Sequence, residues 1–464
     1  MNAMDGDGMD RDVVVVGAGF AGLRCASRLR EAGLRVAVLE ARERIGGRTR
    51  SETLGRMTVD VGGQWIGRGH ERLLALAEAA GATLRPQHVE GAKLLQLSTD
   101  APGRVRRYRG LIPRVSPLAL VELELAIRKL NRLAGEIDPA APWAARHAAE
   151  WDAKTVASWA QRRLRSRGAR EVFDIALRAV MTAEPGALSF LQLLFYCASN
   201  DGFEALTGTT DGAQAWVVEG GMPTLAQWLA RDLGDALQLD CPLQSLEQDA
   251  DGVRLHTPQG CWRARRAVLT LPLPLLAGLD CRPALPARRQ RLAAASPMGS
   301  VIKAVVAYPD AFWRKQGLSG EALSHRLPFN TVFDASWPEA EGGALVGFID
   351  GAPALEQADR SPEERRQAVL ESLIEYFGPQ AGEPSGYIEH NWVTDPWARG
   401  CYTVAMPPGV LSGLGAELRQ PAGAVHFAGT ETARRWTGYI EGALESGERA
   451  ADEVLVALQD AAAA

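Results

Sequence analysis

Three glycines near the start of the chain have the spacing of a turn that binds a dinucleotide. Gly17, Gly19 and Gly22 lie in the run GAGFAG, where Ala18 separates the first two. In such a turn the glycines provide a tight bend, close approach of the backbone to a pyrophosphate, and close packing of helix on strand. Glu40 follows 18 positions after Gly22, near the roughly 20 residues expected for a carboxylate that binds a ribose hydroxyl. The spacing therefore predicts that these five residues contact a dinucleotide cofactor.

A second glycine pair follows the predicted turn. Arg42, Gly46, Gly47 and Arg48 lie in the run ARERIGGRT, which dehydrogenases that use only NAD do not need. The run resembles the R-x-G-G-R motif of flavoproteins built like glutathione reductase and the amine oxidases, where the motif lies along FAD. The resemblance implies that FAD is the cofactor and that these four residues contact it.

Lys303 is the only lysine in the apolar run 300–306. A lysine in such a strand is costly to bury unless it is paired or functional. In the competing interpretation, Lys303 lies at a strand edge and extends its charge into solvent. We treat Lys303 as a candidate for chemistry.

The elements around the first glycine turn are those of a parallel α/β sheet. The β-branched run 13–16 is typical of a strand buried on both faces, and 36–39 predicts a second such strand. The segment 23–32 between them reads as a helix whose first amides would face the pyrophosphate. The predicted fold class is α/β, with a Rossmann-like FAD-binding domain of the glutathione-reductase/amine-oxidase type and a second α+β substrate domain.

Helical periodicity dominates from about 117 to 199, and strands follow at 243–271, 300–308, 344–350 and 386–392. The first of these helices has two apolar stripes that we interpret as core without chemistry, Leu118, Val121 and Leu125 on one and Leu123, Ile127 and Leu130 beside it. A sheet that is interrupted and resumed implies discontinuous domains. We predict an FAD-binding domain of 1–85, 215–298 and 395–464, and a substrate domain of 86–214 and 299–394 that carries the helical part.

Composition and charge are those of an ordinary globular protein. The chain has 464 residues, of which 46% are hydrophobic and 23% charged, and a net charge of −5. This charge favours neither a nucleic acid nor an anionic membrane as partner. The six scattered cysteines show no C-x-x-C pair, which is typical of reduced thiols in a cytoplasmic protein.

The sequence shows no targeting, membrane or metal-binding segment. Residues 1–12 are acidic without an apolar core, so we expect a frayed tail there and no signal peptide. The longest apolar runs fall short of the ~20 residues that a spanning helix needs. The seven histidines lack ligand spacing such as H-E-x-x-H, so we expect no metal site.

Motifs along nearly the whole chain resemble those of the flavin-containing monoamine oxidases. They are GAGFAG with RIGGR, DVGGQWIG, the GGM turn at 220–222, IKAVV followed by FWRK, W-x8-CYT, and HFAGTET with WTGYIEGA. The resemblance implies FAD-dependent oxidation of an amine C–N bond to an imine, which hydrolyses to an aldehyde or ketone. It also implies that dioxygen is reduced to hydrogen peroxide. Family members often dimerise, so a homodimer stays open.

The resemblance also implies four catalytic residues. Tyr402 and Tyr439 match the two tyrosines of an aromatic cage in front of the flavin, and their electron-rich faces suit an amine. Lys303 matches a lysine that holds a water against flavin N5 and is implicated in the reaction with dioxygen. Trp392 matches a tryptophan beside the flavin. Cys401 matches the cysteine that forms a thioether to the flavin 8-methyl carbon in animal enzymes, whereas many bacterial relatives bind FAD non-covalently.

Further cofactor contacts are expected from two glycine-rich turns. A helix that begins near Gly438 would offer free amides and the positive end of its dipole to the flavin's pyrimidine edge. The remaining residues predicted to contact FAD are Gln64, Trp65, Leu243, Gly429, Thr430, Glu431 and Ile440.

Three alternatives stay open. An L-amino-acid oxidase of the same superfamily would need a cation for the substrate carboxylate. Arg68 stands where amine oxidases usually have proline, so Arg68 and Ala205 are the predicted substrate contacts. A biosynthetic amine desaturase or dehydrogenase would share the cofactor. A flavin-binding protein without turnover would have no use for the tyrosine cage or for Lys303.

Overall fold

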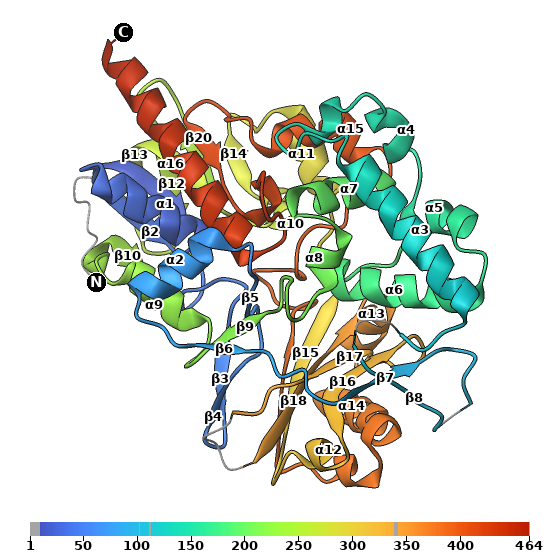
Figure 1. Ribbon diagram of the computed structural model, residues 1–464. Coiled ribbons are helices and arrows are strands. Elements are labelled where there is room, and N and C mark those ends of the chain that lie inside the picture. Colours follow the sequence, from blue (N-terminus) through green and yellow to red (C-terminus); the bar gives the residue numbers. More distant parts are fainter. Residues whose placement is uncertain (1–9, 102, 111–112, 338–341, 464) are drawn as a thin grey trace. The chain divides into compact units, whose positions relative to one another are not determined.

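The computed structural model describes residues 10–101, 103–110, 113–337 and 342–463. The described chain has an α/β fold and divides into two compact units (Figure 1). The first unit comprises Met1–Gly47, Pro223–Pro297 and Leu414–Ala464, and the second comprises Arg48–Met222 and Met298–Gly413.

The first unit is built around parallel strands. Strand β1 (Asp10–Val16) lies between β2 (Val36–Leu39) and β13 (Gly260–Leu269), both parallel to it, and β20 (Val425–Phe427) runs parallel to β13. The valines at 13–16 are buried, as their β-branched run predicts. Because these strands are parallel, their carboxyl ends meet at one edge of the sheet.

Shorter strands extend this sheet on both sides. β10 pairs with β2, while β11, β12 and β13 form an antiparallel meander, and β14 pairs with β11 in parallel. The turn at 251–252 joins β11 to β12, and its Asp-Gly pair is typical of a hairpin turn. The other elements of this unit are α1 (Phe20–Glu31), α9 (Pro223–Ala230), β10 (Leu237–Gln238), β11 (Ser245–Gln248), β12 (Val253–Thr257), α10 (Leu273–Leu276), β14 (Asp280–Arg282), α11 (Ala287–Ala294) and α16 (Ile440–Ala463).

Helices α1 and α16 lie side by side in the first unit (Figure 1). A Cβ atom on Gly447 of α16 would lie 2.3 Å from the carbonyl oxygen of Ala21 in α1. The missing side chain therefore allows the two backbones to touch.

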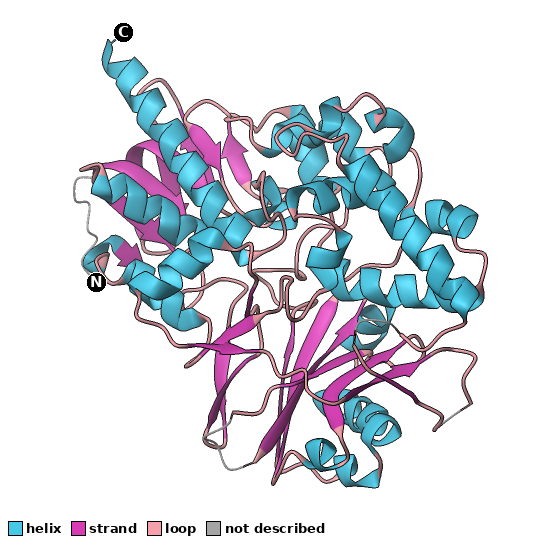
Figure 2. Cartoon of the chain, in the orientation of Figure 1, coloured by secondary structure: helices cyan, strands magenta, loops and turns pink. Residues whose placement is uncertain are grey.

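The second unit contains a seven-stranded sheet in the order β19-β15-β18-β17-β16-β7-β8. Strand β15 (Val301–Tyr308) lies between β18 (Gly343–Asp350) and β19 (Gly386–Asn391) and is antiparallel to both. Every side chain of β15 is buried. Helix α14 (Pro362–Phe377) packs Val369, Leu373 and Phe377 into the apolar core of this sheet, which Figure 2 shows in magenta.

Two small sheets and a group of helices complete the second unit (Figure 2). Their bounds, with those of the other strands, are β3 (Ser51–Leu54), β4 (Met57–Asp60), β5 (Trp65–Ile66), α2 (Glu71–Ala79), β6 (Leu84–Pro86), β7 (Ala92–Gln96), β8 (Arg106–Tyr108), α3 (Pro117–Ala134), α4 (Ala148–Asp152), α5 (Val156–Arg163), α6 (Arg167–Met181), α7 (Phe190–Ser199), α8 (Phe203–Thr207), β9 (Trp216–Val218), α12 (Phe312–Lys315), β16 (Leu318–Ser324), β17 (Thr331–Asp334) and α13 (Ala352–Ala358). Helix α15 (Val410–Leu414) ends at the boundary of the unit.

The predicted helical part is present as α3 to α8, but one expectation for α3 is wrong. The stripe of Leu118, Val121 and Leu125 is exposed, with 64%, 55% and 61% of the side chains accessible. The neighbouring stripe, with Leu123 and Leu130, is buried. Helices α6 and α7 pack on α3, whose buried residues lie on this second stripe.

The borders of the two units differ from the predicted domain borders. Residues 48–85 belong to the second unit because β5 and β6 pair with β9 of that unit. Residues 395–413 also belong there, since Val404 forms a bridge with Met298. The frayed tail predicted over 1–12 is wrong for 10–12, which open β1; the rest lies outside the described residues.

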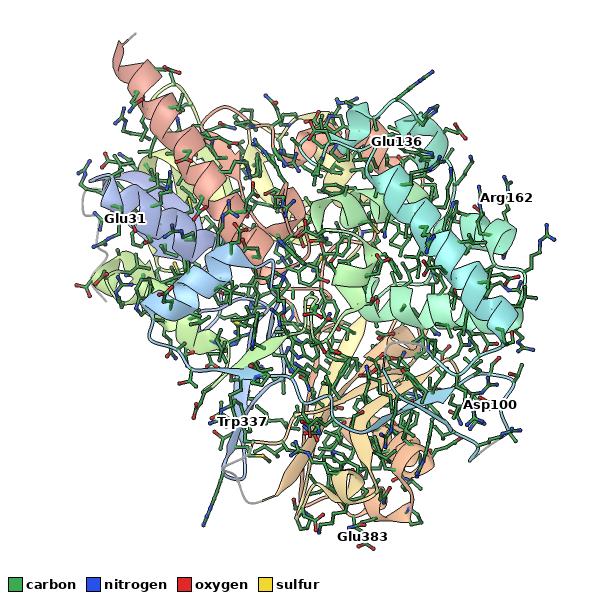
Figure 3. All side chains as sticks on the ribbon, viewed as in Figure 1. Glu31, Asp100, Glu136, Arg162, Trp337 and Glu383 are labelled. Carbon is green, nitrogen blue, oxygen red and sulfur yellow. The ribbon has the colours of Figure 1, made fainter. Side chains whose placement is uncertain are left out.

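Charged side chains line the outside of both units. The labelled Arg162 and Glu383 lie at the outline of the molecule in Figure 3, and Glu31 and Glu136 are exposed as well. Among the described residues, no helix is long and apolar enough to cross a membrane.

Candidate active site

The glycine turn of the first unit follows directly from β1 and opens α1. A Cβ atom on Gly22 would lie 1.9 Å from the carbonyl oxygen of Gly17, so only glycine fits there. Gly19 is the N-cap of α1 and no side chain caps this helix end. The first-turn amides of α1 therefore suit an anion such as a pyrophosphate.

Glu40, at the end of β2, bends back to the same turn. Its Oε2 accepts a hydrogen bond from the Ala18 amide at 2.7 Å, and its Oε1 accepts one from the Arg42 amide at 3.0 Å. The side chain is buried. Each carboxylate oxygen keeps a second lone pair, which suits a ribose hydroxyl.

The second glycine pair packs on the first turn. The Gly46 amide donates to the Ala18 carbonyl at 2.8 Å. A Cβ atom on Gly47 would lie 3.2 Å from Cα of Gly19. Leu243 lies in the same unit, two residues after Cys241, whose amide donates to the Glu40 carbonyl at 2.8 Å. The predicted cofactor contacts from Gly17 to Gly47 therefore lie together at the carboxyl edge of the parallel strands.

A second turn leaves that edge after β20. Gly429 has a φ of 122°, and its amide donates to Ser446 Oγ of α16 at 3.0 Å. Thr430 Oγ1 donates to the Tyr439 carbonyl at 2.8 Å. The Tyr439 ring meets the Trp436 ring edge to face at 5.3 Å. This network fixes the predicted residues from Gly429 through Ile440 as one folded turn at the start of α16.

Lys303 lies in β15 of the second unit, with 2% of its surface exposed. Its Nζ donates to the Gly62 carbonyl at 2.7 Å and to Gln64 Oε1. The Trp65 and Phe348 rings lie 5.6 and 5.5 Å from Nζ. The interpretation of Lys303 as a solvent-reaching edge lysine is therefore wrong.

Asp60 is a partner of this lysine that the motifs did not single out. Its carboxylate accepts hydrogen bonds from Ser51 Oγ at 2.5 Å and from the Met222 amide at 3.2 Å. Burial raises the pKa of Asp60 and lowers the pKa of Lys303, and the opposite charge of each reduces the other's shift. The sequence feature that could have identified Asp60 is its position as the first residue of the DVGGQWIG motif.

Trp392, Cys401 and Tyr402 belong to one apolar cluster of the second unit. The cluster also contains Phe348, whose ring meets the Tyr402 ring at 6.1 Å, and Trp65 packs against it. Trp392 Nε1 donates to the Val61 carbonyl at 2.9 Å, next to the Gly62 carbonyl that binds Lys303. The structure thus brings Trp392, Cys401 and Tyr402 together, with Lys303 beside the same rings.

Two groups hold the backbone of Tyr402 from different segments. Arg48 donates from Nη1 to the Tyr402 carbonyl at 2.7 Å. The Thr182 hydroxyl contacts the peptide between Cys401 and Tyr402. Thr182 has no motif of its own, and sequence reasoning missed it. Tyr439 belongs to the first unit and Tyr402 to the second, so their pairing in one cage stays a prediction.

Arg68 and Ala205 are brought together by the loop at 208–213. The Arg68 amide donates to the Gly212 carbonyl at 3.3 Å, and the Ala213 amide to the Ala205 carbonyl at 2.9 Å. The Arg68 side chain is 57% exposed and pairs with Asp211 at 3.0 Å. Its role as a cation for a substrate carboxylate stays a prediction.

The described chain contains six free cysteines, and Cys401 is buried. Among the described residues, no group of three or more His, Cys, Asp or Glu side chains could hold a metal ion. The arrangement offers a dinucleotide edge in one unit, and an aromatic cluster with a buried lysine in the other.

Comparison with known proteins places this arrangement in a family. The family model "Flavin containing amine oxidoreductase" matches residues 20–455. A probable flavin-containing monoamine oxidase A of Dictyostelium discoideum is 37% identical over 446 residues, which cover 96% of this chain and 97% of the relative. A putative flavin-containing monoamine oxidase, AofH, of Mycobacterium tuberculosis is 37% identical over 449 residues, with the same coverage of both chains.

Two solved structures of amine oxidases also superpose on this chain. Cyclohexylamine oxidase from Brevibacterium oxydans superposes with a TM-score of 0.90 at 35% identity, covering 97% of this chain and 100% of that one. Putrescine oxidase bound to putrescine superposes with a TM-score of 0.92 at 31% identity, covering 97% and 99%.

Proposed function

The chain belongs to the flavin-containing amine oxidoreductases, and from this premise we propose which of its residues carry out amine oxidation and with which oxidant. The protein is an FAD-dependent amine oxidoreductase. When bound, FAD accepts hydrogen from the C–H bond next to the amine nitrogen and passes the electrons to dioxygen, with release of hydrogen peroxide. The observation that carries the proposal is the buried Lys303 side chain beside the aromatic cluster of the second unit.

The first unit holds the dinucleotide part of FAD in this proposal. The free first-turn amides of α1 bind the pyrophosphate, and Glu40 accepts a hydrogen bond from a ribose hydroxyl. The turn from Gly429 to Ile440 presents the start of α16 to the flavin ring, where a helix N-terminus stabilises negative charge.

The second unit binds and orients the amine. Tyr402, Trp392 and their apolar neighbours exclude water, which favours the neutral amine over its ammonium form. Tyr402 and Tyr439 face the nitrogen as a cage. Cys401 would hold the flavin through a thioether to its 8-methyl carbon, and the two hydrogens lost from the thiol and the methyl group would reduce dioxygen to peroxide. The hydrogen leaves the substrate carbon, and the imine that remains hydrolyses after release.

Lys303 acts on the oxidant. Its ammonium is held by two oxygen acceptors and keeps its third N–H group for a water molecule or dioxygen. A fixed positive charge in a buried site stabilises the negative charge that develops as dioxygen is reduced.

A substitution at Lys303 distinguishes a role in the reaction with dioxygen from a role in the oxidation of the amine. Lys303→Met keeps the length of the side chain but removes its charge, so reoxidation by dioxygen should slow by about 100-fold, the scale of one lost electrostatic contact. Anaerobic bleaching of the flavin by the amine should change only a few-fold. Stopped-flow absorbance of both half-reactions is the measurement. Equal slowing of the two half-reactions would contradict the assignment.

The substrate is tested by a peroxide assay on a panel of amines and L-amino acids. The panel includes cyclohexylamine and putrescine, for which the compared structures are named. Peroxide from an L-amino acid and from no amine would refute the amine assignment, and bleaching without peroxide in air would indicate a dehydrogenase. Yellow colour that remains with the acid-precipitated protein supports the thioether at Cys401; a yellow supernatant refutes it.

The reduced thiols of the described chain support a reducing compartment, and we place the enzyme in the cytoplasm. A homodimer stays a prediction.

A further inference from the structure

Thr182 ends helix α6 in a conformation that β-branched residues rarely adopt. Its φ is 50° and its ψ 32°, the left-handed region, and its side chain is fully buried. The Thr182 amide donates to the Arg178 carbonyl at 2.7 Å, and the Thr182 carbonyl accepts from the Ser300 amide at 2.7 Å. The backbone on both sides therefore holds this residue, and its side chain has a fixed direction.

The Thr182 hydroxyl contacts both the carbonyl and the amide of the peptide between Cys401 and Tyr402. Oγ1 lies 2.6 Å from the Cys401 carbonyl oxygen and 2.7 Å from the Met181 carbonyl oxygen, and it accepts a hydrogen bond from the Tyr402 amide at 3.1 Å. A hydroxyl has one hydrogen to donate and two lone pairs to accept with. It is therefore matched to a peptide whose carbonyl and amide both reach it. Neither valine nor alanine could make these bonds.

Three backbone segments are in direct contact around this hydroxyl. A Cβ atom on Gly299 would lie 2.0 Å from Thr182 Oγ1 and 2.7 Å from the Cys401 carbonyl oxygen. A Cβ atom on Gly400 would lie 2.3 Å from the Gly299 carbonyl oxygen. The Cys401 amide donates to the Gly299 carbonyl at 3.0 Å. The two glycines let the segment at 400–402 sit close enough to be held by the side chain of Thr182.

We propose that Thr182 is a positioning residue for amine oxidation. Its hydroxyl fixes the peptide between Cys401 and Tyr402, and thereby the directions of the thiol and of the tyrosine ring. The proposal rests on the proposed function, because it requires that Tyr402 faces the amine. Arg48 fixes the far side of Tyr402 through its carbonyl, so the residue is held at both of its peptide groups.

The test compares Thr182→Val, which keeps the β-branched shape and loses the hydroxyl, with Thr182→Ser, which keeps the hydroxyl. In the FAD-loaded enzyme, backbone amide exchange over 400–404 should be about tenfold faster in Thr182→Val and unchanged in Thr182→Ser, since one buried hydrogen bond is lost in the first. The limiting rate of anaerobic flavin bleaching by an amine should fall by about tenfold in Thr182→Val and less than twofold in Thr182→Ser. The amine concentration at half-maximal rate should stay within about threefold in both, because binding of the amine is not the property that Thr182 controls.

Two results would overturn the proposal. Unchanged exchange in Thr182→Val means that the hydroxyl does not hold the peptide. Faster exchange with an unchanged limiting rate means that the contact serves stability alone. If Thr182→Val does not fold, Thr182→Ala is measured in the same way, since it removes the hydroxyl without placing a methyl group against the peptide.

Failure of the proposed function gives a different pattern. If no amine bleaches the wild-type flavin, amine oxidation is refuted, but amide exchange and the visible circular dichroism of bound FAD need no turnover. A dichroism spectrum that is the same in wild type and Thr182→Val would then overturn the positioning role by itself.

Discussion

Lys303 and Asp60 are two ionisable groups whose pKa values burial shifts in opposite directions. Burial penalises the ammonium of one and the carboxylate of the other. Asp60 is also held by Ser51 and by the Met222 amide, which anchor its charge near the lysine. The proton affinity of Lys303 therefore depends on Asp60.

Asp60→Asn should shift the pH dependence of flavin reoxidation. The substitution removes the negative charge that favours the Lys303 ammonium, so the pKa of Lys303 falls further and the lysine loses its proton at lower pH. The alkaline decline in the rate of reaction with dioxygen should move to lower pH by about one unit. The measurement is stopped-flow reoxidation of the amine-reduced enzyme over a range of pH.

Ser51→Ala is the matched control, because it removes a hydrogen bond to Asp60 and keeps the carboxylate. In Ser51→Ala, the pH at which the rate of reaction with dioxygen declines should lie much closer to that of the wild type. An unshifted pH profile of reoxidation in Asp60→Asn would show that Asp60 does not affect the protonation of Lys303.

At the scale of elements, helix α3 shows that a periodic pattern has more than one reading. Leu130 is fully buried under neighbouring helices, whereas Leu125 on the other stripe is exposed. Leu130→Ala should lower the free energy of unfolding by about 2–5 kcal/mol, the range for a large-to-small change in a core. Leu125→Glu should change it by no more than about 0.5 kcal/mol. Urea unfolding measures both, and a large loss in Leu125→Glu would show that the exposed stripe is covered in solution.

Local sequence was enough where neighbouring residues decide the structure. The strand, glycine turn and helix from 13 to 31 follow from β-branched residues and glycine spacing, and the fold class and the strand at 300–308 were predicted from sequence patterns as well. The face of α3 could not be predicted, because both stripes have helical spacing and only the packing of α6 and α7 decides between them. Thr182 and Asp60 were missed because each acts on a segment more than 200 positions away.

At the scale of the whole molecule, each unit is assembled from separated stretches of chain. Strand β1 has its parallel partner β13 about half the chain away, with Val16 opposite Leu269. Such long-range pairing makes folding slow and leaves strand edges open before it is complete. On dilution from denaturant, the recovered fraction of active enzyme should fall steeply as protein concentration rises. Recovery that is independent of concentration would contradict this expectation.

The same pairing has a consequence for how a cell makes this protein. Val16 leaves the ribosome 253 residues ahead of Leu269, which is about 13–50 s of synthesis at ~5–20 residues per second. During that time the four valines of β1 are in an unfinished sheet and can meet other nascent chains. Extra chaperone would protect this interval, while more FAD would not, because the edge that binds it forms only once β13 has been translated.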